Sequence, residues 1–153
     1  MSNANNAKLV RIATRSWGSN IDDATPLTDE DNRFQVVVEG KAGTVLGASG
    51  QPYALEIGAF DITAVINPHS AANDFTQRRI EQFDAAHGWP HKEAIFTVTI
   101  HDVSSVQGHL LRYYATLVSA NKILSFVESP IFLLYSAWSG DRRNYGWIEE
   151  ETP

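Results

Sequence analysis

Five residues that could act as acid, base or nucleophile lie close together in the second half of the chain: His101, Asp102, Ser104, Ser105 and His109. A Ser-His-Asp site needs a nucleophile on a constrained turn, a base within hydrogen-bond reach and an oxyanion hole. Neither serine stands in the Gly-x-Ser-x-Gly context that exposes a nucleophile on such a turn. Short polar residues are also what a tight corner between strands requires. We therefore expect a polar corner here and assign no catalytic residue.

Two histidines, His87 and His91, have the four-residue spacing that presents two imidazoles to one metal ion on a helix. Gly88 and Pro90 lie between them and argue against a helix. Nothing nearby in the sequence supplies a matched third ligand. The sequence predicts a turn anchored by burial of Trp89, with no metal site.

A loop between residues 18 and 32 carries oxygen ligands of the kind that calcium accepts. These are Asp22, Asp23, Asp29, Glu30, Asp31 and Asn32. An EF-hand loop starting at Asp29 would need glycine at its sixth position and glutamate at its twelfth, but Phe34 and Gly40 stand there. We expect the charge to solvate the loop, and calcium binding stays an open alternative.

Four carboxylates fall on or beside expected strands: Glu39, Glu56, Asp61 and Glu93. Two carboxylates across one sheet face could serve as general acid and base in glycoside cleavage. Acidic residues are equally the ordinary choice on solvent-facing strands, where they discourage pairing between edges. The sequence alone places no two of them at a catalytic distance.

Aromatic residues and arginines gather beyond residue 135. The residues that we expect to form a binding surface are Trp138, Arg142, Arg143, Tyr145 and Trp147. Such side chains dominate protein interfaces, and each aromatic ring buries a large apolar area. Three alternatives are open: the segment packs on its own domain, docks on a partner or second copy, or stacks on a ligand such as a glycan.

The elements that must position these side chains are strands. Residues 108–135 consist of two β-rich runs around a polar turn at 119–122, which is the pattern of an antiparallel hairpin. In this hairpin Arg112 and Glu128 are expected to form a cross-strand ion pair.

Further strands are predicted over 8–17, 34–39, 53–66 and 93–101. Within 53–66 the apolar positions change phase at Gly58, which predicts a bulge or bend. The glycine-rich stretch 40–50 predicts a turn around a short extended piece at 44–46. Residues 73–89 fit a helix and an irregular extended segment equally well, because their apolar residues follow neither period.

Strands in this number, with turn signals at short intervals, predict an all-β antiparallel sandwich of seven to nine strands with at most one short helix. A small β-barrel is the alternative. The run 108–117, Gly-His-Leu-Leu-Arg-Tyr-Tyr-Ala-Thr-Leu, resembles the strand that carries the tyrosine corner of immunoglobulin-like domains. The resemblance implies that the hydroxyl of Tyr113 or Tyr114 bonds back to the corner at 102–108. It concerns architecture and carries no function.

The composition agrees with one soluble globular domain. The chain has 153 residues, of which 43% are hydrophobic, so a buried core is expected. We expect disorder over 1–7, the sandwich over 8–135 and an aromatic tail over 136–153. A net charge of -6 argues against a nucleic-acid partner.

The absence of cysteine excludes disulfides, thiolate zinc sites and cysteine nucleophiles. It favours a reducing compartment, so we expect a cytoplasmic location, with secretion after removal of a leader as the alternative. The polar N-terminus lacks the apolar stretch of a signal peptide, and no apolar run is long enough for a transmembrane helix.

These observations favour a non-enzymatic binding or assembly module, without a cofactor, that self-associates or docks another protein through the aromatic tail. The alternative is a small β-barrel enzyme, or a protein that binds a glycan or other small molecule in an internal or surface pocket. In that case His101, Asp61 and Tyr113 are the first candidates for acid–base chemistry.

Overall fold

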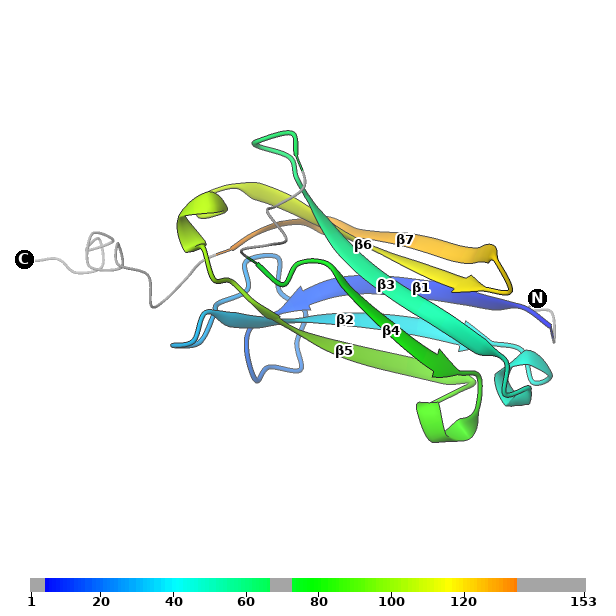
Figure 1. Ribbon diagram of the computed structural model, residues 1–153. Coiled ribbons are helices and arrows are strands. Elements are labelled where there is room, and N and C mark those ends of the chain that lie inside the picture. The colour runs from blue at the N-terminus through cyan, green and yellow to red at the C-terminus, as the bar shows by residue number, and fades with distance from the viewer. Residues whose placement is uncertain (1–4, 67–72, 135–153) are drawn as a thin grey trace, which may run out of the picture.

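The computed structural model describes residues 5–66 and 73–134, and this part of the chain is built from strands (Figure 1). They are β1 (Ala7–Arg15), β2 (Arg33–Ala42), β3 (Pro52–Asp61), β4 (Gln77–Gln82), β5 (His91–Thr99), β6 (Leu110–Ser119) and β7 (Lys122–Leu133). Three single turns of 3-10 helix, η1 (Leu46–Ala48), η2 (Ala85–His87) and η3 (Val103–Ser105), are the only helical elements in the described ranges.

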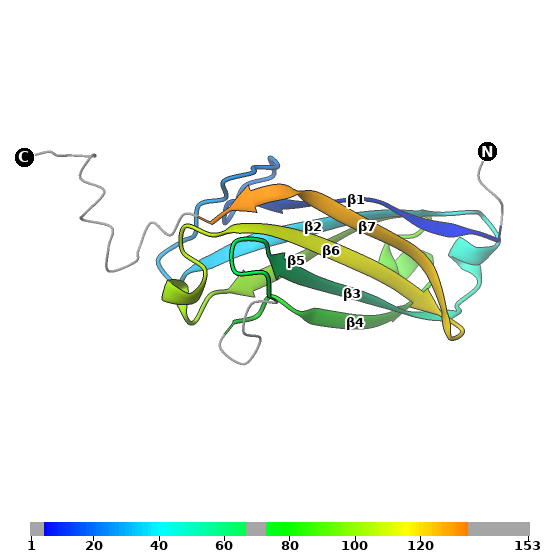
Figure 2. The same cartoon turned by 90° about the horizontal axis from the view of Figure 1, so that it is seen from above.

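The strands form two antiparallel sheets that stack face to face (Figures 1 and 2). One sheet has the order β1-β2-β5 and the other has the order β4-β3-β6-β7. This is the immunoglobulin-like sandwich that the sequence predicts. The barrel alternative is wrong, because β1 and β7 run side by side where the sheets meet without forming a ladder (Figure 2).

The core lies between the sheets and is made by alternate residues, as the strand pattern predicts. On β6, Leu111, Tyr113, Ala115 and Leu117 all point inward and are fully buried. The inward residues of β2 and β5 are Phe34, Val36, Val38, Ala94, Phe96 and Val98. Burial of this set is the main contribution to stability, since it removes apolar area from both sheets at once.

Four aromatic rings connect the two sheets at the centre of the core. Phe34 of β2 lies 6.2 Å from Phe132 of β7, 6.5 Å from Tyr113 of β6 and 6.2 Å from Phe75, measured between ring centroids. Tyr113 and Phe132 stack at 5.8 Å. Pairs at such distances stabilise beyond the area that they bury.

The buried hydroxyl of Tyr113 donates a 2.8 Å hydrogen bond to the carbonyl oxygen of Phe75. The prediction that this hydroxyl bonds to the corner at 102–108 is therefore wrong. Its acceptor lies in the segment before β4. Tyr114, the other candidate, is next along β6 and points to the outer face of the sheet.

The hairpin of β6 and β7 is confirmed. Its turn residues Ala120 and Asn121 both have left-handed backbone, with φ of 52° and 61°, which is the geometry of a two-residue type I′ turn. The expected pairing of Arg112 with Glu128 is wrong. A register shift places Arg112 opposite Ile131 and Glu128 opposite Tyr114.

Strand β3 does not change phase at Gly58. Its ladder with β6 runs in one register from Ala54 to Asp61, so Asp61 is buried and Phe60 is exposed. Position 58 requires glycine for a different reason. The ring of Tyr114 lies directly on it and leaves no room for a Cβ atom. The expected extended piece at 44–46 is also wrong, since a turn leads there into η1.

Residues 77–82 form the edge strand β4, which corrects the expectation of a helix or irregular segment at 73–89. Its sequence shows no apolar alternation, because side chains of β4 form hydrogen bonds with β5, the edge strand of the other sheet. The Gln77 amide donates to the carbonyl of Thr97 at 2.7 Å, and the Arg79 guanidinium donates to the carbonyl of Ile95. Two free acceptors of β5 are satisfied in this way.

We expect Tyr113→Phe to lower the free energy of unfolding by about 1–3 kcal/mol, because the buried carbonyl of Phe75 loses its donor. Chemical denaturation monitored by tryptophan fluorescence measures this. Tyr114→Phe is the matched control and should change stability by less than about 0.5 kcal/mol. Equal effects of the two substitutions would contradict the role given to the Tyr113 hydroxyl.

Candidate functional site

The end of the sandwich that holds the expected acid–base residues is tied together by Asp61. Its Oδ2 lies 2.6 Å from Nδ1 of His109, and its Oδ1 accepts from the backbone N–H of Ala64 at 2.9 Å. The backbone of Asp61 also pairs with Ile66. Asp61 thus joins the turn after β3 to the segment before β6.

The neighbouring corner is polar, as expected. The buried amide of Asn73 accepts from the N–H of Asp102 at 3.0 Å and donates to Ser105 Oγ at 3.2 Å. The Ser104 hydroxyl donates to the Asp102 carboxylate at 2.7 Å, and the Ser105 hydroxyl donates to the Asp102 carbonyl at 2.8 Å. Both hydroxyls therefore hold the corner in shape.

The three acid–base candidates are not joined in one site. His101 is exposed and lies 3.8 Å from Asp74, Asp61 contacts His109, and Tyr113 bonds the Phe75 carbonyl. Burial raises the pKa of Tyr113 well above its usual range, so this hydroxyl keeps its proton.

The acidic loop directs its carboxylates at arginines. Asp22 pairs with Arg11 and Arg15, and Asp29 pairs with Arg33 at 2.6 Å. Burial opposes ionisation of Asp29, but hydrogen bonds from the Arg33 side chain and from backbone N–H groups outweigh it and lower the pKa of this carboxyl. No group of three or more His, Asp or Glu side chains able to hold a metal ion occurs within residues 5–66 and 73–134.

The two expected histidines take different roles. Asp84 caps η2 and accepts from the His87 N–H at 3.0 Å, while its Oδ1 also lies 2.8 Å from His87 Nδ1. His91 is exposed at the start of β5. Trp89 between them is buried, as predicted.

Trp89 belongs to a buried polar relay that the sequence did not reveal. Its indole N–H donates to the Tyr53 hydroxyl at 3.1 Å, which in turn donates to Glu81 at 2.7 Å. Lys92 lies 2.9 Å from the same carboxylate oxygen. Burial raises the pKa of Glu81, but the bonds from Tyr53 and Lys92 outweigh it, so the net shift is downward.

Ion pairs cross the outer face of the three-stranded sheet. Glu39 and Glu93 stand opposite each other on β2 and β5, which brings two of the expected carboxylates together. Arg11 pairs with Glu39 at 2.7 Å, and the mostly buried Arg15 reaches Glu93 at 3.7 Å. The arginines thus offset the repulsion between two like charges on an open surface.

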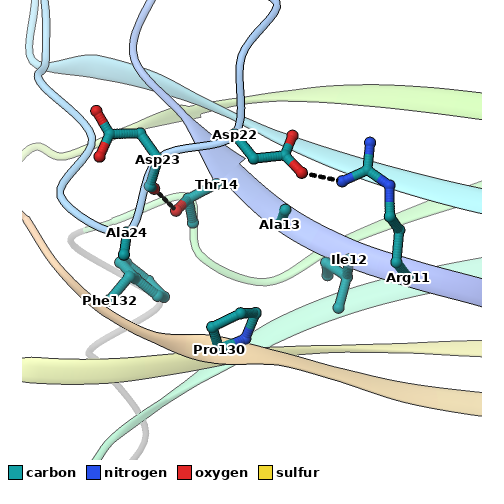
Figure 3. Close-up of a pocket in the computed structure, with 9 residues that line it drawn as sticks. All are labelled: Arg11, Ile12, Ala13, Thr14, Asp22, Asp23, Ala24, Pro130 and Phe132. Carbon is teal, nitrogen blue, oxygen red and sulfur yellow. Dashed lines mark hydrogen bonds and ion pairs between the residues drawn. The ribbon is translucent and has the colours of Figure 1, made fainter.

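A surface pocket of about 260 Å³ lies between β1, the segment 22–24 and β7 (Figure 3). Ile12, Pro130 and Phe132 contribute apolar surface, and Arg11 and Asp22 form an ion pair beside them. Thr14 donates to the Asp23 carbonyl at 2.6 Å and fixes the opposite wall. The pocket combines an apolar floor with a charged rim.

The outer face of the four-stranded sheet exposes more large apolar side chains than the other outer face does. We call it the apolar face; its apolar residues are Ala54, Phe60, Ile80, Leu110, Tyr114, Val118, Ile123, Phe126 and Ile131, and its charged residues are Arg112, Glu128 and the ion pair of Glu56 with Arg78. Ile123 is 70% exposed, Ile80 is 68% exposed and Phe126 is 56% exposed. Exposed apolar surface on this scale marks an interaction surface more often than chance exposure does.

The amino-acid sequence carries a signal for this face that was not used above. Residues 123–133 read Ile-Leu-Ser-Phe-Val-Glu-Ser-Pro-Ile-Phe-Leu, with apolar residues at both odd and even positions. A strand with one solvated face would alternate. The expected binding residues Trp138, Arg142, Arg143, Tyr145 and Trp147 lie outside the described residues.

Comparison with known proteins identifies the fold and no family. No protein-family model matches the chain, and no curated protein matches it either. Among the described residues, no helix is both long and apolar enough to cross a membrane.

Solved structures with a similar fold include a putative β-galactosidase from Bacteroides fragilis, with a TM-score of 0.50 and 10% identity over 81% of this chain. A glycosyl hydrolase family 2 member from Bacteroides cellulosilyticus gives a TM-score of 0.48 and 10% identity over 83% of this chain. This chain spans only 17% and 14% of those two proteins.

A domain of the outer membrane lipoprotein Omp28 from Porphyromonas gingivalis has a TM-score of 0.43 and 9% identity, over 88% of this chain and 95% of that domain. At such identities the likeness concerns the fold alone.

We expect Glu81→Gln to lower the free energy of unfolding by about 1.5–3 kcal/mol at neutral pH, since it weakens charged hydrogen bonds in the relay. The folded pKa of Glu81 is below its unfolded value, which is about 4.3. Its contribution is therefore complete above the unfolded pKa and is lost as the pH falls through the folded pKa.

The stability difference between wild type and Glu81→Gln should be constant from about pH 6 to 8 and shrink below about pH 4. Urea unfolding at several pH values measures it, with the exposed Glu30→Gln as control. A difference that grows as the pH falls would contradict this assignment.

Proposed function

We propose that the protein is a non-enzymatic binding and assembly module that contacts a second copy or another protein through the segment 136–153. The contact residues in this proposal are Trp138, Arg142, Arg143, Tyr145 and Trp147. The observation that supports it best is the place where the described part of the chain ends. Leu134, the last described residue, follows the end of β7, and β7 carries Ile123, Phe126 and Ile131 of the apolar face.

Two further observations favour binding over catalysis. The hydroxyls of Ser104, Ser105 and Tyr113 donate to groups of the fold, so they are engaged in holding structure. The opposed carboxylates Glu39 and Glu93 lie on the outer face of the sheet, and each is paired with an arginine. The cytoplasmic location expected from the sequence stays a prediction.

A small ligand such as a sugar is the second candidate, and the pocket of Figure 3 favours it. Its apolar floor suits the face of one sugar ring, and the charged side chains Arg11 and Asp22 suit hydroxyl groups. The fold also occurs in a putative β-galactosidase, where it makes up a minor part of the chain.

Deletion of residues 136–153 is expected to lower the average mass of the protein in solution, because aromatic contact area is lost. Sedimentation velocity over a range of concentrations compares the full chain with the chain ending at residue 135. A variant with Arg142→Ala and Arg143→Ala keeps the tryptophans and should weaken association less. Unchanged mass and unchanged thermal stability after the deletion would refute the proposal.

For the second candidate, galactose and glucose are added separately and the thermal unfolding midpoint is measured. A sugar present at about 100 times its Kd stabilises the folded state by about 2.7 kcal/mol. Ala24→Leu adds volume beside the pocket and should abolish that shift, whereas Ala48→Leu, on an exposed turn elsewhere, should not. A shift that survives Ala24→Leu would exclude this pocket.

A further inference from the structure

The apolar face is ordered in rows across the four strands. Ile80, Ala54, Val118 and Ile123 form one row, and Arg78, Glu56, Thr116 and Phe126 form the next. Gly58, Tyr114 and Glu128 follow, and then Phe60, Arg112 and Ile131. The two central strands of the face carry Ala54, Gly58 and Val118 beside the larger Phe60, Tyr114 and Arg112.

Two charges on this face have no ion-pair partner among the described residues. The Nε of Arg112 is buried and has no hydrogen-bond partner in the part of the chain that the structure describes. Glu128 is exposed and forms no ion pair with any described residue. The Arg112 guanidinium thus carries its charge on this face without an acceptor among the described residues, and a carboxylate of another molecule that reaches its terminal nitrogens would complement it.

The two residues are placed so that one copy can satisfy another. They lie on neighbouring strands in adjacent rows of the same face. In a two-fold interface, a residue i that contacts residue j of the partner is matched by j contacting i. A two-fold axis between Arg112 and Glu128 brings each guanidinium onto the carboxylate of the other copy, which gives two charge pairs.

The size of the face is adequate for such a pair. Four strands at about 4.8 Å spacing and rows spanning about eight residues cover roughly 500 Å² in plan. Two copies would therefore bury about 1,000 Å² or more, which is near the lower bound for a specific interface. The outer face of the other sheet carries ion pairs already satisfied within the chain and offers no comparable surface.

We propose that the apolar face binds a second copy of this chain in a two-fold, sheet-on-sheet dimer, with Arg112 of each copy paired to Glu128 of the other. This contact is separate from the one proposed for residues 136–153, and either can fail alone. Ile123 and Phe126 of β7 supply exposed apolar contact area, and Tyr114, whose ring lies 6.1 Å from that of Phe126, supports it.

The first test replaces Ile123 and Phe126 with lysine in the full chain. Sedimentation velocity is expected to show a dimer dissociation constant raised by roughly 30-fold or more, since two interface anchors are lost. The matched control replaces Ile21, which is 71% exposed in a loop, and Ile95 on the other outer face, so the added charge is the same. The control should associate like wild type.

The second test uses charge reversal. Arg112→Glu and Glu128→Arg are each expected to disfavour self-pairing at this face through like charges, whereas an equimolar mixture of the two is expected to associate as mixed dimers. The segment 136–153 is the same in both variants, so the mixture reports on the apolar face alone. Circular dichroism confirms that each variant is folded.

The proposal is overturned if the full chain sediments as a monomer up to about 1 mM, where association is worth only about 4 kcal/mol. It is also overturned if the lysine variant and its control associate equally, as they would if another part of the chain or a different protein covered this face. Failure of the reversed pair to associate when mixed would exclude the two-fold arrangement.

Discussion

The contact on which the structure depends is that of Phe34 with Phe132 and Tyr113 across the space between the sheets. Hydrogen bonds hold each sheet together, but none of the described ladders joins one sheet to the other. The sheets stay together because these rings and the aliphatic residues around them are removed from water. Phe75 adds a fourth ring, and its carbonyl anchors the Tyr113 hydroxyl, so the segment before β4 is tied to the same centre.

The two outer faces of the sandwich differ in the side chains that they expose to solvent. On the three-stranded sheet, the side chain of Arg15 reaches Glu93 across the row of residues that holds the fully buried Val37. On the four-stranded sheet, Phe126 and Ile123 remain open to solvent with no charged chain laid over them. One outer face thus has its charges paired within the described residues, and the other leaves large apolar side chains exposed.

Much of this architecture could be predicted because a strand with one buried face has apolar residues at every second position. The alternation in 110–119 and 94–100 identified the inward residues correctly, and the turn at Ala120 and Asn121 followed from polar residues between two apolar runs. Strand β4 could not be found in this way, because Gln77 and Arg79 bond to β5 and carry no apolar pattern. The register shift that separates Arg112 from Glu128 depends on the path of β7 around Ser129 and Pro130, which no local pattern encodes.

The candidate sites were harder to predict, since they depend on residues distant in sequence. Asp61 and His109 meet only because β3 and β6 are neighbours, and Tyr53 meets Glu81 only because β4 pairs with β3. The pocket joins residues 11–14 to Pro130 and Phe132, more than a hundred positions away. Residue types had suggested acid–base chemistry for His101, Asp61 and Tyr113. In the structure each of the three contacts a different residue, so they do not form one site.

The side chains of Gln77 and Arg79 have one more consequence. By occupying carbonyl acceptors along the open side of β5, they remove the template on which an extended strand from elsewhere could add. Lateral growth into a continuous ribbon, the route to fibrils, is thereby hindered along this edge.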